Sequence, residues 1–172
     1  MEVEKAIRTR RTHKAYSPAA LEPGVIEELV ELARWAPNHN LTNPWRFRVI
    51  GERTRALLMA LAEAQEPGSA VKLRRAPTLI AVSARTSGEA VRDREDLLAT
   101  GVAAYLVLLG AHARGLAGYW RTVALLDTDD ARRALGLDEG ETPVGVLYLG
   151  HPVQEQRVPE RAAVAEILSY LD

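Results

Sequence analysis

A long apolar segment constrains the fold of this chain more than any other feature of its sequence. The segment LLATGVAAYLVLLGAHA forms the centre of a predicted helix that runs from about Asp93 to Arg114. It is apolar around nearly the whole circumference of a helix, whereas a surface helix has a polar face. We therefore expect this helix to be buried on most sides. In a chain of 172 residues, such burial is easier to achieve if part of the helix lies in a subunit interface.

The rest of the chain alternates helical and extended patterns, without repeats or a long linker. This alternation predicts one compact domain over residues 1–172, of the α/β or α+β class. Apolar residues at helical or alternating spacing support the individual elements. Helices are expected over Val3–Thr9, between LEPG and Pro37, and in RTRALLMALAEAQ, DTDDARRALGL and PERAAVAEILSYL, and strands in WRFRVIG, TLIAVSA, LAGYWRTVAL and PVGVLYLG.

Composition and charge narrow the possible functions. With 47% hydrophobic and 26% charged residues, the chain has the composition of a soluble globular protein. No secretory signal pattern and no run of about 18 uncharged apolar residues are present, so we expect a cytoplasmic protein. The lack of cysteine excludes disulfides and thiolate chemistry, and the scattered histidines do not have metal-site spacing. A net charge of -1 argues against a generally cationic nucleic-acid or membrane binder.

A basic cluster near the N-terminus, RTRRTHK, is the first candidate site. Arg8, Arg10, Arg11 and Lys14 supply four cations, and Thr12 adds a hydroxyl. Arginine forks match phosphate oxygens, so this set of side chains is suited to binding a phosphate group. A solvated, charged helix end would give the same pattern, and so would a segment that binds nucleic acid.

The segment APNHNLTNPW, residues 36–45, is the second candidate. It contains all the asparagines of the chain and lies between a predicted helix and a predicted strand. Loops held by regular elements are where ligand contacts concentrate. Turn formation would explain one or two of the asparagines, but not a cluster beside Trp35 and Trp45. The third tryptophan stands in a further candidate, GYWRT, which would otherwise be a half-buried Trp beside a surface Arg.

Taken together, these segments resemble the nitroreductase family of flavoproteins, and in particular its short branch. The match runs the length of the chain. It rests on Arg10-Arg11-Thr12 followed by Lys14, on WAPNHNLTNPWRF, on GYWRT and on VGVLYLGHP, which occur in the family's order and at compatible spacings.

The resemblance implies an α+β fold with an antiparallel-rich central sheet flanked by helices. It also implies a homodimer formed through the long central helix, with FMN bound at the subunit interface. Arg10, Arg11 and Thr12 would surround the phosphate and ribityl end. The full set of cofactor-binding residues that it implies is Arg10, Arg11, Thr12, Lys14, Pro37, Asn38, His39, Asn43, Trp120, Arg121 and Thr122, with residues 37–39 supplied by the other subunit.

The activity implied by the resemblance is an FMN-dependent oxidoreductase. NAD(P)H would reduce the flavin, which would then reduce nitro compounds, quinones or related small acceptors in a ping-pong hydride transfer. No side chain need act as a general base, so no catalytic residue is assigned. Lys14 and Arg121 are the candidates for stabilising negative charge on reduced flavin, and His39 is expected to contact the cofactor. The alternative is a non-catalytic dimer that binds a nucleotide or nucleic acid through the segment from Arg8 to Lys14.

Three positions deserve inspection because they depart from the family pattern or vary within it. Asn43 stands where the family has a glutamine, and it is shorter by one methylene. Trp35 replaces an arginine of a close branch and would pack under the cofactor or in the interface. Arg157 occupies a C-terminal region in which many relatives place a cation against the phosphate.

Overall fold

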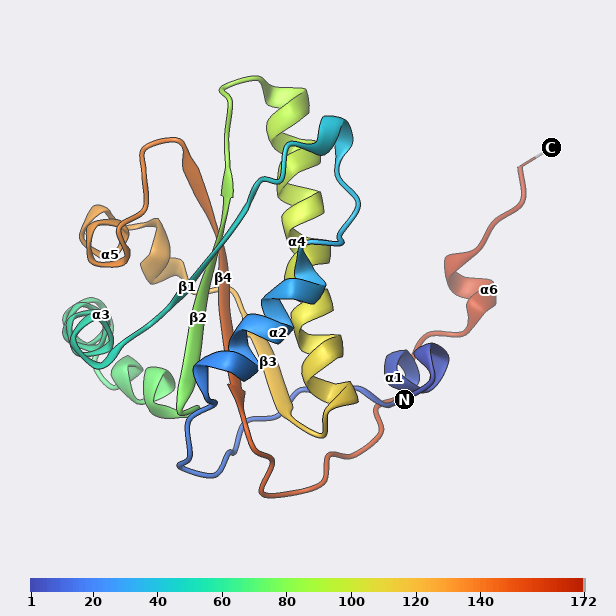
Figure 1. Cartoon of the computed structure of the whole chain (residues 1–172), viewed down its shortest axis with the longest axis horizontal. Helices are drawn as coiled ribbons and strands as arrows, with labels where there is room; N and C mark the ends of the chain where they lie inside the picture. The colour runs from blue at the N-terminus through green and yellow to red at the C-terminus, as the bar shows by residue number, and fades with distance from the viewer. Residues whose placement is uncertain (172) are drawn as a thin grey trace.

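The protein is built around a four-stranded antiparallel sheet with helices on both faces (Figure 1). In this computed structural model, residues 1–171 are described. The strands follow the order β1-β2-β4-β3 across the sheet. Their bounds are Trp45–Val49 for β1, Thr78–Arg85 for β2, Ala117–Arg121 for β3 and Glu141–Gly150 for β4. The α+β class and the antiparallel sheet that the resemblance implied are therefore confirmed.

The helices lie close to their predicted positions. The α-helices are α1 (Val3–Thr9), α2 (Pro23–Ala33), α3 (Glu52–Gln65), α4 (Ala90–Ala113), α5 (Asp129–Leu135) and α6 (Val164–Ile167). Three short 3-10 helices are η1 (His39–Leu41), η2 (Ser69–Arg74) and η3 (Ala124–Asp127). The helix boundaries were predictable from local residues. Proline begins α2, and Gly136 in the left-handed conformation ends α5, as is common at helix boundaries.

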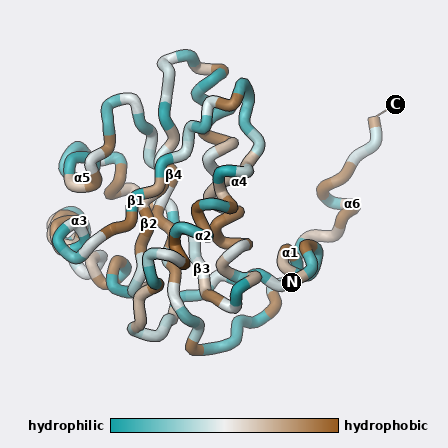
Figure 2. Tube along the Cα trace, in the orientation of Figure 1, coloured by the Kyte–Doolittle hydropathy of each residue, from teal (hydrophilic) through white to brown (hydrophobic). Residues whose placement is uncertain are grey.

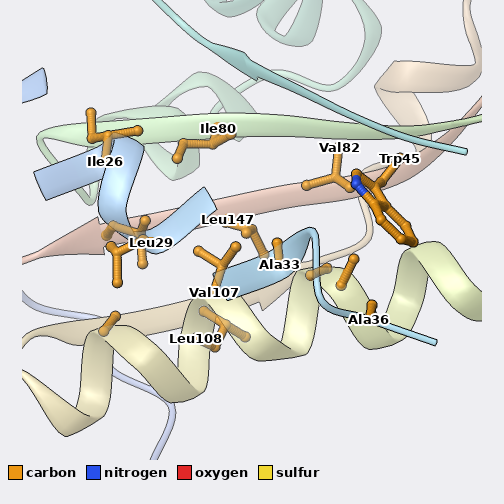
Figure 3. Packing of buried hydrophobic residues seen from close by; sticks show 14 of the residues in the cluster. Ile26, Leu29, Ala33, Ala36, Trp45, Ile80, Val82, Val107, Leu108 and Leu147 are labelled. Carbon is orange, nitrogen blue, oxygen red and sulfur yellow. The ribbon is translucent and has the colours of Figure 1, made fainter. Parts of the chain in front are cut away.

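One face of the sheet is covered by α2 and α4 (Figure 3). Side chains alternate along each strand, so Ile80 and Val82 of β2 point to this face together with Leu147 of β4. They meet Leu29 of α2 and Val107 of α4, all fully or almost fully buried. The opposite face is covered by α3, α5, η2 and η3. They pack on the alternate residues of the strands, such as Leu79 of β2 and Tyr148 of β4, in a second buried cluster.

The long helix α4 confirms the predicted helix, and the structure refines how it is buried. Ala103, Ala104 and Val107 lie on its inner side and are inaccessible to solvent. Its outer side keeps an apolar stripe in which Val91 is 75% and Leu98 64% exposed. By length and composition alone α4 would suffice to cross a membrane, but half of that segment is buried against the protein. It is the core helix of this fold, with one flank left uncovered within a protomer.

The C-terminal segment differs from the expectation of a helix through PERAAVAEILSYL. Only Val164–Ile167 is helical, and the chain around it runs away from the body of the protein (Figure 1). Apolar residues recur along this tail (Figure 2). Ile167 is 76% exposed, and the aromatic Tyr170 is 89% exposed. Short helices are marginal unless they pack against something. All side chains of residues 161–171 are exposed, and the helical pattern is realised over a single turn.

Candidate functional site

The basic segment is tied to the edge of the sheet where β3 begins. Thr12 forms a parallel bridge with Gly118, and the backbone N–H of His13 donates to the Gly118 carbonyl at 3.1 Å. Tyr16 then donates its hydroxyl to the His13 carbonyl at 2.7 Å. A side chain at Gly118 would collide with Leu108 of α4, so glycine permits the close packing of β3 on this helix. The cations of the segment therefore project from backbone that is fixed by the fold.

The individual cations of this segment are placed in different ways. The guanidinium of Arg10 lies 5.7 Å from the centre of the Tyr105 ring, a cation–π contact with α4. Arg11 folds back, and its Nη1 donates to two backbone carbonyls of its own segment at 2.7 and 2.8 Å. Thr12 and Lys14 are exposed. The cluster thus combines two partly buried arginines with two polar side chains that are open to solvent.

Several buried nitrogen atoms of this segment lack hydrogen-bond partners. Within residues 1–171, Nε of Arg10, Nε of Arg11 and Nδ1 of His13 have none, although such groups are normally satisfied. Burial lowers the pKa of His13, and His112 and Arg10 lower it further. Burial likewise lowers the pKa of His112, with Arg10 and Arg11 adding to the effect. Unpaired donors in a locally positive field are what an anionic phosphate group would satisfy.

The GYWRT segment forms β3 and places its tryptophan between α4 and β4. Trp120 donates from Nε1 to the Val144 carbonyl at 3.3 Å. A Cβ at Gly145 would lie 2.6 Å from that Nε1 and 2.7 Å from the Arg121 carbonyl, and its φ of 146° suits glycine alone. On the other side, Gly101 of α4 leaves room for the ring. The strand ends at Arg121, half-buried, and Thr122 beyond it is exposed.

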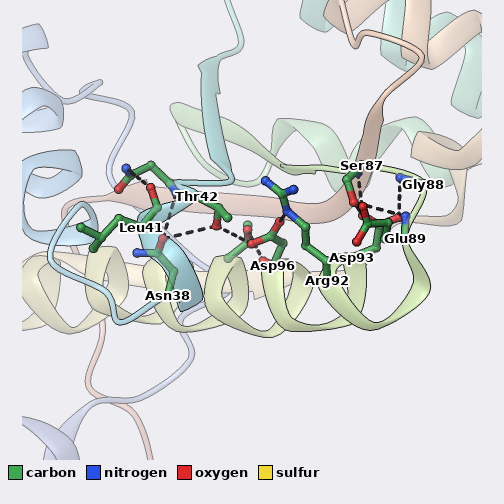
Figure 4. Close-up of polar contacts among 11 residues, drawn as sticks. Asn38, Leu41, Thr42, Ser87, Gly88, Glu89, Arg92, Asp93 and Asp96 are labelled. Atoms are coloured by element: carbon green, nitrogen blue, oxygen red, sulfur yellow. Dashed lines mark hydrogen bonds and ion pairs between the residues drawn. The ribbon is translucent and has the colours of Figure 1, made fainter.

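The asparagine-rich loop is folded by its own side chains (Figure 4). The Asn38 carboxamide oxygen accepts the Asn43 backbone N–H at 2.9 Å, and Asn43 Nδ2 donates to the Leu41 carbonyl at 2.7 Å. Thr42 donates its hydroxyl to a carboxylate oxygen of Asp96, which is 5% exposed on α4. Asn43 therefore uses its amide for the loop itself, and the shorter side chain has a structural role here.

The backbone of this loop is unusual. Asn40, Leu41 and Asn43 all have positive φ, at 51°, 51° and 46°. Asparagine tolerates this left-handed region, whereas leucine rarely adopts it. Pro37 and His39 are exposed, and Leu41 is 77% exposed. The loop thus presents polar and apolar side chains outward from a constrained backbone.

The long helix α4 organises all three candidate segments without joining them into one site. Thr42 of the loop bonds to Asp96, Trp120 packs near Gly101, and Arg10 lies over Tyr105. Asp96 and Tyr105 are separated by about 14 Å along a helix axis at 1.5 Å per residue, and they fall on different faces. The basic segment pairs with β3, which contains the GYWRT segment. The asparagine-rich loop lies apart from both within a protomer.

The residues that the sequence did not single out all contact predicted site residues or their segments. Asp96 holds the loop, Tyr105 carries Arg10, His112 accompanies the basic segment, and Gly145 makes room for Trp120. Asp96 had a usable signal, because an acid on the buried side of an apolar helix is uncommon. The other three had none, since their contacts come from distant parts of the sequence.

The positions singled out as departures lie at the surface. Trp35 is 75% exposed, and its Nε1 donates to Glu31 at 3.3 Å. Glu31 is also paired with Arg34 at 2.9 Å. Arg157 is exposed in the C-terminal tail. Within the protomer, Trp35 therefore lies at the surface and not in the hydrophobic core.

Comparison with known proteins gives consistent matches across the chain. A model of the nitroreductase family matches residues 7–151. A protein of Escherichia coli (strain K12), provisionally named as an NAD(P)H nitroreductase, is 30% identical over 163 residues, which cover 88% of this chain and 89% of that protein. A nitroreductase-like family protein from Bacillus cereus has a TM-score of 0.89 at 24% identity, with 100% and 97% of the two chains covered. A provisionally assigned nitroreductase from Desulfovibrio desulfuricans, in complex with FMN, has a TM-score of 0.81 at 27% identity, covering 99% of this chain and 96% of that one.

Proposed function

The chain belongs to the nitroreductase family, and from this membership we propose that it is an FMN-dependent oxidoreductase that takes electrons from NAD(P)H. Its acceptors would be nitro compounds, quinones or related small oxidants. The FMN-bound relative from Desulfovibrio desulfuricans and the Escherichia coli relative support the cofactor and the electron donor. We expect a cytoplasmic protein whose partners are small molecules and a second copy of itself.

One observation carries the proposal, namely the buried nitrogen atoms of the basic segment that lack partners. Arg10 and Arg11 bring two guanidinium groups to this place, and a phosphate would accept charge-assisted hydrogen bonds from them. These residues fit the phosphate end of FMN, and Thr12 beside them would contact the ribityl chain. Lys14 would reach toward the pyrimidine edge of the flavin. No observation of comparable weight favours the alternative of a non-catalytic nucleotide- or nucleic-acid-binding dimer.

A homodimer would complete this site. Val91, Leu98 and Val102 form an exposed apolar stripe on α4, and a partner would remove that stripe from water. The asparagine-rich loop and Arg10 of the same protomer contact different sides of α4, at Asp96 and Tyr105, so one flavin would not lie against both. We therefore assign Pro37, Asn38, His39 and Asn43 to the flavin held by the basic segment of the partner. The exposed apolar residues of the C-terminal tail support association in the same way.

The residues of this chain would position the cofactor and stabilise its charge. When bound, FMN would supply two-electron chemistry between NAD(P)H and the acceptor, in the proposed ping-pong order. Lys14 and Arg121 would stand near the pyrimidine edge, where a cation stabilises negative charge and raises the reduction potential. Trp120, Arg121 and Thr122 would line the side opposite the partner's loop. No general base is required, and His39 would hydrogen-bond the cofactor.

The test is the FMN affinity of purified protein. The parent should be yellow or become so when FMN is added, and anaerobic NADH or NADPH should bleach it. Arg10→Ala should weaken FMN binding by about tenfold or more, because a charge-assisted hydrogen bond to phosphate is lost. The spectrum of any flavin that stays bound should be unchanged, since the contact is remote from the ring.

Arg8→Ala is the matched control. Arg8 is exposed in the same basic cluster, and within residues 1–171 its guanidinium pairs with Glu4 alone, at 3.7 Å. Its removal should leave FMN affinity within about twofold. Equal FMN affinity in parent and Arg10→Ala would refute the phosphate assignment. A colourless parent that binds no added FMN would refute the enzyme function as a whole.

A further inference from the structure

One buried carboxylate holds the asparagine-rich loop against the rest of the protein. Asp96 lies on the inner side of α4, and its side chain is 6% exposed. One of its oxygens accepts the Thr42 hydroxyl. The other lies 3.9 Å from Nε of Arg92, whose own side chain is 51% exposed. The loop is thus connected to α4 through a single charged group, drawn at the centre of Figure 4.

Stability alone does not explain an acid at this place. The neighbours of Asp96 on the inner side of α4 include Ala99 and Ala103, which pack in the hydrophobic core. A charge costs free energy when it is removed from water, and a weak contact with an exposed arginine offsets little of that cost. An apolar residue would serve the core better. The carboxylate is therefore best understood by what it holds, which is Thr42.

The loop needs an external support because its own bonds do not orient it. The hydrogen bonds of Asn38 and Asn43 close the loop on itself. Its left-handed residues, Leu41 above all, persist only if the surroundings hold them in place. Among residues 1–171, Asp96 is the side-chain hydrogen-bond partner of the loop that lies on another element, apart from the adjoining strand β1. Breaking this link would leave the loop anchored at its buried ends, Ala36 and Trp45, but without its hydrogen bond to α4.

We propose that Asp96 and Thr42 form a positioning pair, which fixes the asparagine-rich loop in the orientation that binds the partner subunit's FMN. The inference rests on the proposed function and extends it to a residue of α4 that the flavin would not touch. Preorganisation reduces the ordering that binding must otherwise supply. Asp96 and Thr42 would then raise FMN affinity without contacting the cofactor, by keeping His39 and its neighbours in place.

The test combines substitutions at both residues with two readouts. Thr42→Val keeps the shape and removes the hydroxyl, whereas Asp96→Leu removes the carboxylate and favours the core. Each variant should weaken FMN binding by about fivefold to tenfold, and the double variant by no more than either one, because both break the same link. Amide hydrogen exchange of residues 38–43 in the FMN-free protein should become faster in all three. Asp96→Asn retains an oxygen acceptor for Thr42 and should restore most of the affinity.

Asp93→Asn is the matched control on the same helix. Asp93 accepts hydrogen bonds from Ser87 at 2.6 and 2.9 Å and from Gly88 at 3.1 Å, so it holds a different turn. This variant should leave FMN affinity and loop exchange at the parent values. If it weakens FMN as much as Asp96→Leu does, the effect is one of charge and the positioning role is wrong.

The outcomes separate the two proposals. A parent that binds FMN, together with Thr42→Val and Asp96→Leu variants that bind it equally well, would overturn the positioning pair and leave the proposed function intact. A parent that binds no FMN would overturn the proposed function itself. In that case unchanged exchange of residues 38–43 in the variants would overturn the loop-fixing role as well. Because Asp96→Leu is expected to fold, its melting temperature serves as the check on stability.

Discussion

The helices on the two faces of the sheet differ in how much apolar surface they leave exposed to solvent. The face under α3 and α5 is covered by helices that expose single apolar side chains, such as Leu57 at 57%, and its core residues Leu58, Leu79 and Tyr148 are essentially inaccessible. The face under α2 and α4 is equally well packed inside, but α4 presents Val91 and Leu98 outward. We call these the closed face and the open face. The contrast indicates that the open face keeps an apolar stripe on α4 that a single protomer does not cover.

The basic segment, the asparagine-rich loop and Trp120 follow the open face, whereas Arg121 and Thr122 lie beside α3 and η2. All three predicted segments contact α4, whereas the closed face carries a buried ionic network that no ligand is needed to explain. There Arg48 forms a bidentate pair with Glu141 at 2.7 and 2.8 Å, and Ser83 donates to the same carboxylate. The network joins β1, β2 and β4 beside α5. With the exception of Arg121 and Thr122, which lie beside α3 and η2, the predicted binding residues are thus separated from these structural charges by the sheet.

The largest effect on stability is expected on the closed face. Leu58 is 1% exposed in the second core cluster, so Leu58→Ala should lower the free energy of unfolding by about 3 kcal/mol through lost burial and a cavity. Urea unfolding would measure the change. The variant should keep the proposed dimer and the proposed FMN affinity, because Arg10, Arg11 and the asparagine-rich loop lie on the other face. Loss of FMN binding without loss of stability would break the comparison.

A smaller, pH-dependent effect is expected from the ionic network. Burial by itself raises the pKa of Glu141, but hydrogen bonds from Arg48 and Ser83 outweigh it, and the net pKa lies below the ordinary value. The group therefore stabilises the fold above the ordinary glutamate pKa and loses this contribution as pH falls through its own. Glu141→Gln should cost about 2 kcal/mol at pH 7. It should also flatten the fall in unfolding free energy below about pH 5.

That prediction is checked by unfolding parent and variant over a range of pH. The matched control is Glu63→Gln on α3, because Glu63 is exposed and accepts one backbone N–H, from Gly68 at 2.8 Å. Its stability should follow the parent curve closely. Parallel pH curves for parent and Glu141→Gln would show that the network does not contribute through this carboxylate.

The smallest effect on the protomer fold is expected on the open face. Leu98 is 64% exposed, so Leu98→Ser should change the intrinsic stability of the protomer by less than about 0.5 kcal/mol. Its consequence should appear in association, because a partner would bury this side chain. Sedimentation equilibrium should show a dimer that dissociates at about tenfold higher concentration than the parent. An unchanged dissociation constant would remove Leu98 from the interface.

Local patterns were enough to predict most of the elements. The helix Val3–Thr9 was predicted with its observed bounds, and the predicted bounds of α4 lay within a few residues of the observed ones. Both succeeded because apolar spacing and boundary residues act over one or two turns. The prediction of a continuous C-terminal helix was wrong, because a local pattern does not show whether the helix will have a surface to pack against. Its helical pattern is genuine, but helices of this length depend on packing that one protomer does not provide.

The candidate site was predicted in its parts and not in its arrangement. The sequence determined the residue types, namely the cations of Arg10 and Arg11 and the asparagines of one loop, together with the family resemblance that they carry. Only the tertiary structure decided that Asp96 holds the loop, that Gly145 admits Trp120, and that the loop stands apart from the basic segment within a protomer. Side-chain chemistry is written residue by residue, whereas these relations depend on contacts between positions far apart in the chain, which exist only once the helices and the sheet have packed.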